Sequence, residues 1–182
     1  MTKQVAKTSR HVFLEEGNLV IRQFEDTDLK DLTLILQGIL SEELASSMKP
    51  EECTEEYVKD LVQLFRKGGK VLLAEVDKRI VGYRFVLVGS KYNRHVAFAQ
   101  GLGVHPKYRG RGIATKLMQV ALDILREEGI EKFVGTPAVS NAAVRKILEK
   151  TGFIIEGRLK KHLKLDDKYE DLLIASIFLK EK

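Results

Sequence analysis

Cysteine, proline, tryptophan and long apolar runs are scarce or absent in this sequence. Of 182 residues, one is cysteine, three are proline and none is tryptophan, and the aromatic fraction is 7%. The single cysteine, Cys53, forms no intrachain disulfide and supplies no multi-cysteine metal site, which favours a reducing compartment. No run of about 18 apolar residues occurs, and the polar start from Met1 to Arg10 is unlike a signal peptide. We therefore expect a cytoplasmic protein with no metal and no membrane partner.

A strong charge of either sign is also missing. The chain has 31 Lys and Arg against 26 Asp and Glu, a formal charge of +5, and the two signs are mostly interspersed. A nucleic-acid binder would show a concentrated basic stripe with aromatic residues, so nucleic acid is not the expected partner. The hydrophobic fraction of 44% is enough for a substantial core and excludes a disordered or collagen-like chain.

Apolar periodicity predicts an α+β domain with a mostly antiparallel sheet of six to seven strands and about four helices. Strands are expected at residues 19–24, 71–76, 80–88, 95–104, 133–135, 153–159 and 172–179. Helices are expected at residues 29–40, 54–67, 112–128 and 140–150, and Ser140 is expected to cap the last of them. Residues 1–17 are interpreted as a loose leader and residues 18–182 as one domain.

The strand at 95–104 has an unusual pattern, because strict alternation leaves one of its faces nearly bare. That alternation puts Gln100 and Leu102 on one face and Gly101 and Gly103 on the other. Two glycines in a strand indicate a bulge or the close approach of a ligand to the backbone. Tight packing against a neighbouring helix explains them equally well.

The segment from Val104 to Thr115 is predicted to be a strand end, a turn at Pro106, a glycine-rich loop and a helix start. Such a loop directs several backbone N–H groups at one point, and the helix dipole adds about half a positive charge there. The segment is therefore an anion cradle. Its spacing does not fit G-x-x-x-x-G-K-[ST], and the G-x-G that begins at Gly101 meets Pro106 where the third glycine of a dinucleotide loop belongs.

The sequence Arg-Gly-Arg-Gly-Ile-Ala at 109–114 resembles the Q/R-x-x-G-x-G/A signature of the GNAT superfamily of N-acetyltransferases. Ser-Asn-Ala-Ala at 140–143, followed by Leu-Glu-Lys-Thr-Gly-Phe at 148–153, is similar to that family's asparagine helix and its K-x-G-F ending. Residues 156–171 resemble the tail of the ribosomal-protein and phosphinothricin acetyltransferase branch. The resemblance covers about residues 18–179 and implies the GNAT fold.

The resemblance implies acetyl-CoA as co-substrate and an amine as acceptor. It assigns the pyrophosphate to the loop and helix start, that is Arg109, Gly110, Arg111, Gly112, Ile113, Ala114 and Thr115. It assigns the pantetheine arm to the backbone of Leu102, Gly103 and Val104 and to the side chain of Asn141, which has a plain helix-capping role as its alternative. A free N–H beside a bulge would stabilise a tetrahedral oxyanion, a contribution of about 3 kcal/mol per donor in other acyl-transfer enzymes.

The resemblance supplies no acid or base. Leu148 stands where many relatives have the tyrosine that protonates departing CoA, and Ala99 and Gln100 stand where relatives often carry a carboxylate. A thiol with a pKa of about 8.5 leaves as a thiolate without an acid, and water or a distant group would take the amine proton. Tyr169 and His162 are the weak candidates for catalysis, although a solvated basic hairpin is the favoured interpretation of their segment.

The leading hypothesis is an enzyme that moves acetyl from acetyl-CoA to a primary amine by direct attack within a ternary complex. The alternatives are a non-catalytic acyl-CoA-binding module and a nucleic-acid binder using residues 158–164. A protein N-terminus, a polyamine, an amino acid and an antibiotic all remain open as acceptors, and a homodimer is compatible with the sequence. Acidic residues in the expected acceptor wall could attract a cationic amine, or simply end helices; they are Glu42, Glu43, Glu51 and Glu52.

Overall fold

One mixed sheet with helices on both faces forms the fold of the computed structural model, which describes residues 11–41, 49–165 and 168–180. The strands are β1 (Val12–Glu16), β2 (Leu19–Gln23), β3 (Gly69–Val76), β4 (Arg79–Val88), β5 (Val96–Val104), β6 (Lys132–Gly135), β7 (Ile154–Leu165) and β8 (Lys168–Phe178). The helices are α1 (Leu29–Leu40), α2 (Glu55–Arg66), α3 (Ile113–Glu127) and α4 (Ala142–Lys150), with short 3₁₀ turns at Asp26–Asp28, Pro50–Glu52, Lys91–Asn93 and Pro106–Tyr108.

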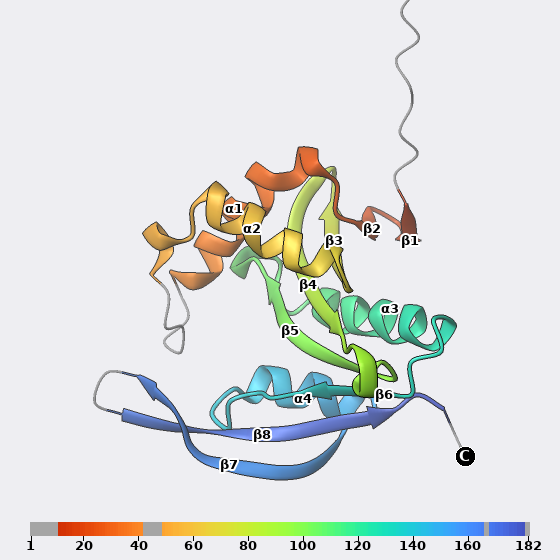
Figure 1. Ribbon diagram of the computed structural model, residues 1–182. Helices are drawn as coiled ribbons and strands as arrows, with labels where there is room; N and C mark the ends of the chain where they lie inside the picture. The colour runs from red at the N-terminus through yellow and green to blue at the C-terminus, as the bar shows by residue number, and fades with distance from the viewer. Residues whose placement is uncertain (1–10, 42–48, 166–167, 181–182) are drawn as a thin grey trace, which may run out of the picture.

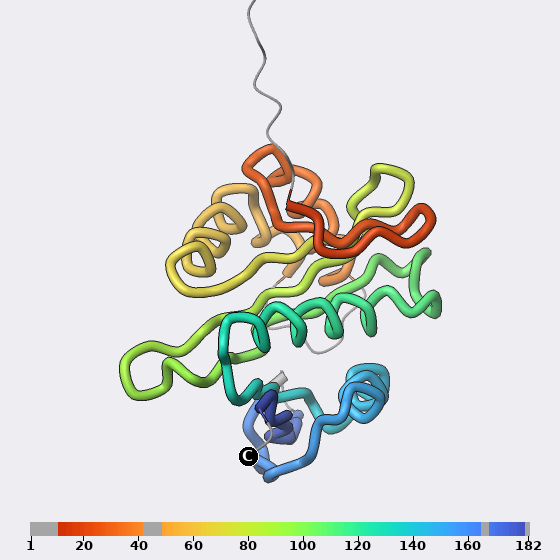
Figure 2. The backbone as a smooth tube through the Cα atoms, turned by 90° about the vertical axis from the view of Figure 1, so that its right-hand side faces the viewer, coloured from red at the N-terminus to blue at the C-terminus, as the bar shows by residue number. Residues whose placement is uncertain are grey.

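The strands lie in the order β1-β2-β3-β4-β5-β6-β8-β7, and among these described strands only β5 and β6 pair in parallel. Helices α1 and α2 pack on one face of β3 to β5, and α3 packs on the other face with α4 beside it (Figures 1 and 2). The α+β class, the mostly antiparallel sheet and the four helices are confirmed. The described sheet has eight strands rather than the six to seven expected.

The parallel strands β5 and β6 are paired over only part of their length, near the centre of the sheet. The two strands pair only from Val96 with Lys132 to Phe98 with Val134, and β6 ends at Gly135, whereas β5 continues to Val104. Beyond Phe98, β5 therefore has no strand partner on that side within the part of the chain that the structure describes. Because strand edges carry backbone N–H and C=O groups, this leaves a polar edge in the middle of the sheet.

Three local expectations are corrected. Part of the expected leader is strand β1, which pairs with β2 through contacts such as Leu14 with Ile21; residues 1–10 lie outside the described residues. The stretch between the expected strands 153–159 and 172–179 is largely strand as well, because β7 and β8 extend to Leu165 and start at Lys168 as a long antiparallel pair. The N-cap of α4 is Asn141 rather than Ser140, and its side chain accepts a hydrogen bond from the N–H of Val144.

The alternation expected for β5 is wrong beyond Ala99, because a bulge interrupts it. Phe85 pairs with Gly101 and Val86 pairs with Ala99, so Gln100 is the extra residue. The bulge puts Leu102 on the same face as Ala99, against the core around α3. A bulge was one of the three explanations offered for the glycines, and it is confirmed.

Gly101 and Gly103 are small because protein side chains occupy the space beside them. A Cβ atom on Gly103 would lie 2.6 Å from Cε1 of Tyr83 and 2.7 Å from Cδ1 of Ile39. A Cβ atom on Gly101 would lie 3.1 Å from Cδ2 of Phe85. The bare face of the strand is thus filled by tight packing, including against α1, and a ligand can approach β5 only along its open edge.

Candidate active site

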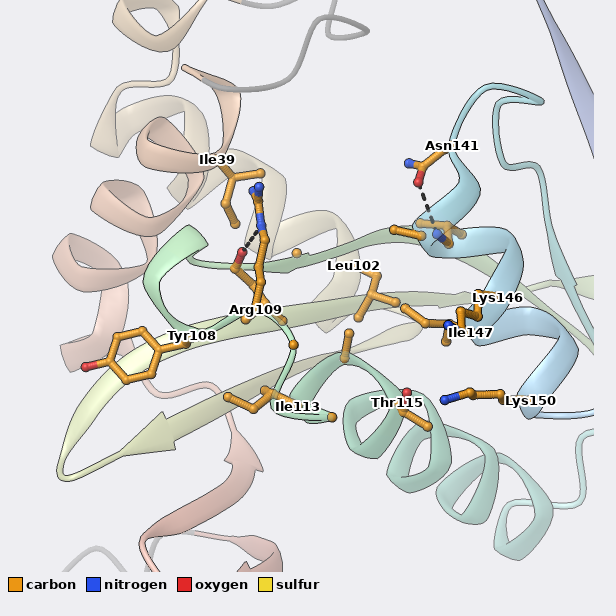
Figure 3. A pocket seen from close by; sticks show the side chains of 17 residues that line it. Ile39, Leu102, Tyr108, Arg109, Ile113, Thr115, Asn141, Lys146, Ile147 and Lys150 are labelled. Carbon is orange, nitrogen blue, oxygen red and sulfur yellow. Dashed lines mark hydrogen bonds between the residues drawn. The ribbon is translucent and has the colours of Figure 1, made fainter.

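The cavity at the open edge of β5 has a volume of about 570 Å³ and lies between the start of α3 and helix α4 (Figure 3). Ten of the eleven residues expected to bind the co-substrate line it: Leu102, Gly103, Val104, Arg109, Gly110, Gly112, Ile113, Ala114, Thr115 and Asn141. The remaining one, Arg111, does not. One cavity thus joins the edge of β5 with the glycine-rich loop.

The glycines of the loop give the start of α3 its open form. Gly110 and Gly112 have φ angles of 76° and 78°, in the left-handed region that favours glycine, and a Cβ atom on either would meet nothing within 4 Å. Gly112 is the N-cap residue of α3, and no side chain caps the helix there. The first N–H groups of a helix have no partner within the helix, so at α3 they remain available to an anion.

The two arginines of the loop have different surroundings. The Nε atom of Arg109 donates to the carbonyl oxygen of Val104 at 3.0 Å, which ties the loop to the end of β5 (Figure 3). The Arg111 guanidinium lies 5.0 Å from the centre of the Tyr108 ring and donates to the carbonyl oxygen of Lys107 at 3.3 Å. Arg109 therefore shapes the cavity, whereas Arg111 packs on the outside of the turn.

Helix α4 supplies the opposite wall, including cations that the sequence patterns did not single out. Lys146 and Lys150 line the cavity, and Figure 3 shows Lys150 pointing across it toward Thr115 on α3. The other unanticipated lining residues are Ile39, Tyr108, Ala143, Val144 and Ile147. Lys146 and Lys150 are four residues apart and so share a helix face, which is the signal that could have identified them.

Asn141 has the capping role that was its alternative. Its Oδ1 atom accepts from the N–H of Val144 at 3.0 Å. The side chain nevertheless lines the cavity, so its amide nitrogen is the group that can donate to a ligand.

Leu148 lies in the core and not in the cavity. Its side chain is 4% exposed and packs in the cluster that contains Phe133 and Phe153, whereas its neighbour Ile147 lines the cavity. Leu148 is thus a packing residue, whatever side chain relatives carry there.

Replacing Leu148 by tyrosine is expected to destabilise the protein by about 1 to 3 kcal/mol, because a larger side chain with a hydroxyl must enter a filled core. Denaturant unfolding of the variant and the native protein measures this difference. Unchanged stability together with faster turnover would contradict it, because the phenol would then have reached the cavity.

The two weak catalytic candidates are not brought to the cavity. His162 lies exposed on β7, and Tyr169 lies on β8 with 55% of its surface exposed and its ring centre 5.5 Å from Nζ of Lys161. Asp171 accepts from the backbone N–H of Lys161 and from Nε of Arg158, and these bonds hold the pKa of that carboxyl below its usual range. This hairpin is a solvated polar surface.

The remaining candidates point to no second site. The basic cluster proposed for nucleic acid, residues 158–164, is partly neutralised, because Arg158 forms an ion pair with Asp171 at 2.7 Å. Cys53 is buried, and burial raises the pKa of its thiol, which keeps it protonated and unreactive. Glu52 accepts from the N–H of Lys49 as a helix-end residue does, Glu51 is exposed, and Glu42 and Glu43 lie outside the described residues.

Among the described residues, no helix is long and apolar enough to cross a membrane. Nor do three His, Cys, Asp or Glu side chains gather as a metal site requires, within residues 11–41, 49–165 and 168–180.

Comparison with known proteins agrees with this geometry. Residues 37–153 match the acetyltransferase (GNAT) family, and the chain belongs to that family. It is 33% identical over 110 residues to the L-amino acid N-acetyltransferase AaaT of Escherichia coli, a match that covers 58% of this chain and 66% of the relative, slightly under two thirds.

Solved structures share the fold. RimL, a ribosomal L7/L12 alpha-N-protein acetyltransferase in complex with coenzyme A, superposes with a TM-score of 0.80 at 18% identity, covering 92% of this chain and 98% of RimL. YncA from Salmonella typhimurium, solved with its cofactor acetyl-CoA, gives a TM-score of 0.76 at 19% identity over 91% of this chain and 96% of its own.

Proposed function

We propose that this protein transfers the acetyl group of acetyl-CoA to a primary amine, and that residues 18–182 act, together with strand β1, as one acetyltransferase domain. The observation that carries the proposal is the single cavity that joins an uncapped helix N-terminus to an unpaired strand edge. Coenzyme A has the matching chemistry, because its pyrophosphate is an anion and its pantetheine arm carries two amides.

Residues that line the cavity have suitable chemistry for each part of coenzyme A, from the pyrophosphate to the pantetheine arm. The N–H groups at Gly112, Ile113 and Ala114 would hold the pyrophosphate, since no Cβ fills the cradle at Gly110 or Gly112. Lys146 and Lys150 would add positive charge on the facing wall. The backbone edge from Leu102 to Val104 and the amide nitrogen of Asn141 would bind the pantetheine amides, as an added strand does.

The reaction needs one group transfer without a covalent enzyme intermediate. The neutral amine nitrogen attacks the thioester carbonyl, the C–N bond forms and the C–S bond breaks. Coenzyme A leaves as a thiolate, and the amine proton passes to water. None of the residues lining the cavity in the described part of the chain is Asp, Glu or His, so these residues supply no carboxylate or imidazole base.

The chemical class of the acceptor can be identified by testing a panel of amines. AaaT is named for L-amino acids and RimL for a protein N-terminus, so the panel should contain L-amino acids, short peptides with free N-termini and polyamines. The protein is mixed with acetyl-CoA and each amine, and free thiol is followed over time. We expect at least one class to release thiol faster than acetyl-CoA alone.

Binding is measured beside turnover so that the alternatives separate. Acetyl-CoA at about 100 times its Kd is expected to stabilise the fold by about 2.7 kcal/mol, visible as a rise in Tm. Tight binding with no thiol release from any amine would identify the non-catalytic acyl-CoA-binding module. Absence of any stabilisation by acetyl-CoA or coenzyme A would overturn the assignment of the cavity.

A further inference from the structure

Arg84 is a buried arginine that lies directly behind the open edge of β5. It belongs to β4, pairs with Leu102 of β5, and is 3% exposed. Its Nη1 atom donates to the carbonyl oxygen of Gly101 at 3.3 Å, and its guanidinium lies 5.1 Å from the centre of the Phe133 ring on β6. The Arg84 guanidinium thus contacts both β5 and β6 near the point where these two strands separate.

Arg84 differs in its hydrogen-bond partners from Arg22, the other buried arginine among the described residues. Arg22 is 2% exposed and bonds to Asp28 at 2.6 Å and Glu75 at 3.0 Å. By contrast, Nε and Nη2 of Arg84 have no hydrogen-bond partner among the described residues, and burial lowers the pKa of Arg84 to about 10. A buried charge without a carboxylate costs stability, so the fold alone does not account for an arginine here.

The carbonyl group to which Arg84 donates belongs to the peptide unit between Gly101 and Leu102. The C=O of Gly101 and the N–H of Leu102 are parts of one planar peptide group and point in opposite directions. A Cβ atom on Gly82 would lie 2.9 Å from the carbonyl oxygen of Gly103, so the polar groups of Gly103 face β4. Successive residues of a strand direct these groups to opposite edges, and the N–H of Leu102 therefore faces the open edge.

This peptide unit has a restraint beyond the pairing of Gly101 with Phe85 of β4. It follows the bulge at Gln100, where the ladder between β4 and β5 is interrupted, and Gly101 has no side chain to limit its backbone. Arg84 supplies a charged donor to the carbonyl, and its bond to Gly101 fixes the direction of the N–H on the other side of the same plane.

We propose that Arg84 is a positioning residue: by holding the Gly101 carbonyl, it aims the N–H of Leu102 at the thioester carbonyl oxygen of bound acetyl-CoA. This inference rests on the proposed function. The N–H stabilises the negative charge that develops on that oxygen when the amine attacks, while Arg84 itself does not touch the substrate.

The test compares Arg84→Met, which removes the donor, Arg84→Lys, which keeps a charged donor, and the matched control Arg22→Met. The probe is acetyl-CoA with a heavy-carbon label at its carbonyl, whose stretching frequency is read by difference infrared spectroscopy without any acceptor. In the native protein we expect binding to lower that frequency, because an N–H polarises the carbonyl. Arg84→Met should lose most of this shift while its Kd for acetyl-CoA changes less than about threefold.

Stability and rate give independent readouts. Arg84→Met should have a Tm equal to or above that of the native protein, because an uncompensated charge is removed, whereas Arg22→Met should have a lower Tm and an unchanged frequency shift. With the best amine from the panel, kcat should fall by about tenfold or more for Arg84→Met, and Arg84→Lys should recover part of both kcat and the shift.

A native frequency shift retained in full by folded Arg84→Met would overturn the proposal. So would a loss of shift matched by an equal loss in Arg84→Lys, because the donor would then be irrelevant. If native protein does not bind acetyl-CoA at all, the proposed function itself fails, and this result is separate from a failure of Arg84 because it precedes every variant.

Discussion

Gly112→Glu is expected to weaken coenzyme A binding by at least about 100-fold, equivalent to about 2.7 kcal/mol, while the protein stays folded. Gly112 caps α3 at the point where the first N–H groups of the helix are open, and its φ angle is 78°. A glutamate there puts a carboxylate at the positive end of the helix dipole, where the phosphate of the ligand would lie. Isothermal titration calorimetry with coenzyme A measures the change.

A second glycine of the same helix provides the control. Gly129, just beyond the end of α3, has a φ angle of 76°, and a Cβ atom there meets nothing within 4 Å, as at Gly112. Gly129→Glu thus carries the same backbone strain, about 1 to 2 kcal/mol, but lies away from the cavity. We expect both variants to lose stability and only Gly112→Glu to lose coenzyme A.

Equal affinities in the two folded variants would refute the cradle. Equal losses of affinity would attribute the effect to backbone strain in α3 and not to the carboxylate, which would also refute it.

Most of the regular structure could be predicted because its signals are local. The α1 helix extends over residues 29–40 as its apolar spacing indicates, and the α3 helix ends before Gly129, which has the left-handed conformation of a helix stop. The backbone of the glycine-rich loop was predictable for the same reason, since the glycine spacing and the helix that follows are properties of consecutive residues.

The errors came from features that depend on pairing between strands. Val12–Glu16 forms a strand because β2 offers a partner, and the bulge at Gln100 exists only in the register of β4 with β5. A strict alternation could not show that Ile39 of α1 would occupy the space beside Gly103. Which side chain fills a space like this depends on the tertiary packing of elements that are far apart in the sequence.

The same limit applies to the site. Lys146 lines the cavity because of the way α4 faces α3, and Arg84 is informative because it is buried without a carboxylate, which no sequence pattern states. In contrast, His162 and Tyr169 drew attention by residue type alone, and the structure puts both on the exposed hairpin.

The rate of transfer to an aliphatic amine is expected to rise about tenfold per pH unit from about pH 7 to about pH 9. Such an amine has a pKa near 10, so the neutral fraction that can attack grows in this proportion. A histidine base would instead produce a rise near pH 6.5 and a plateau above it. No described residue that lines the cavity is a histidine or a carboxylate, which is why we expect the continuous rise.

The measurement is kcat/KM over this range for the native protein, His162→Ala and Tyr169→Phe, with one amine of known pKa. Both side chains are exposed on the β7–β8 hairpin and neither lines the cavity, so the three profiles should climb together. A native profile that levels off by about pH 7 and loses its inflection in one variant would make that residue the base or its positioning partner. Three parallel rising profiles would instead mean that water takes the amine proton and that the hairpin has no part in the chemistry.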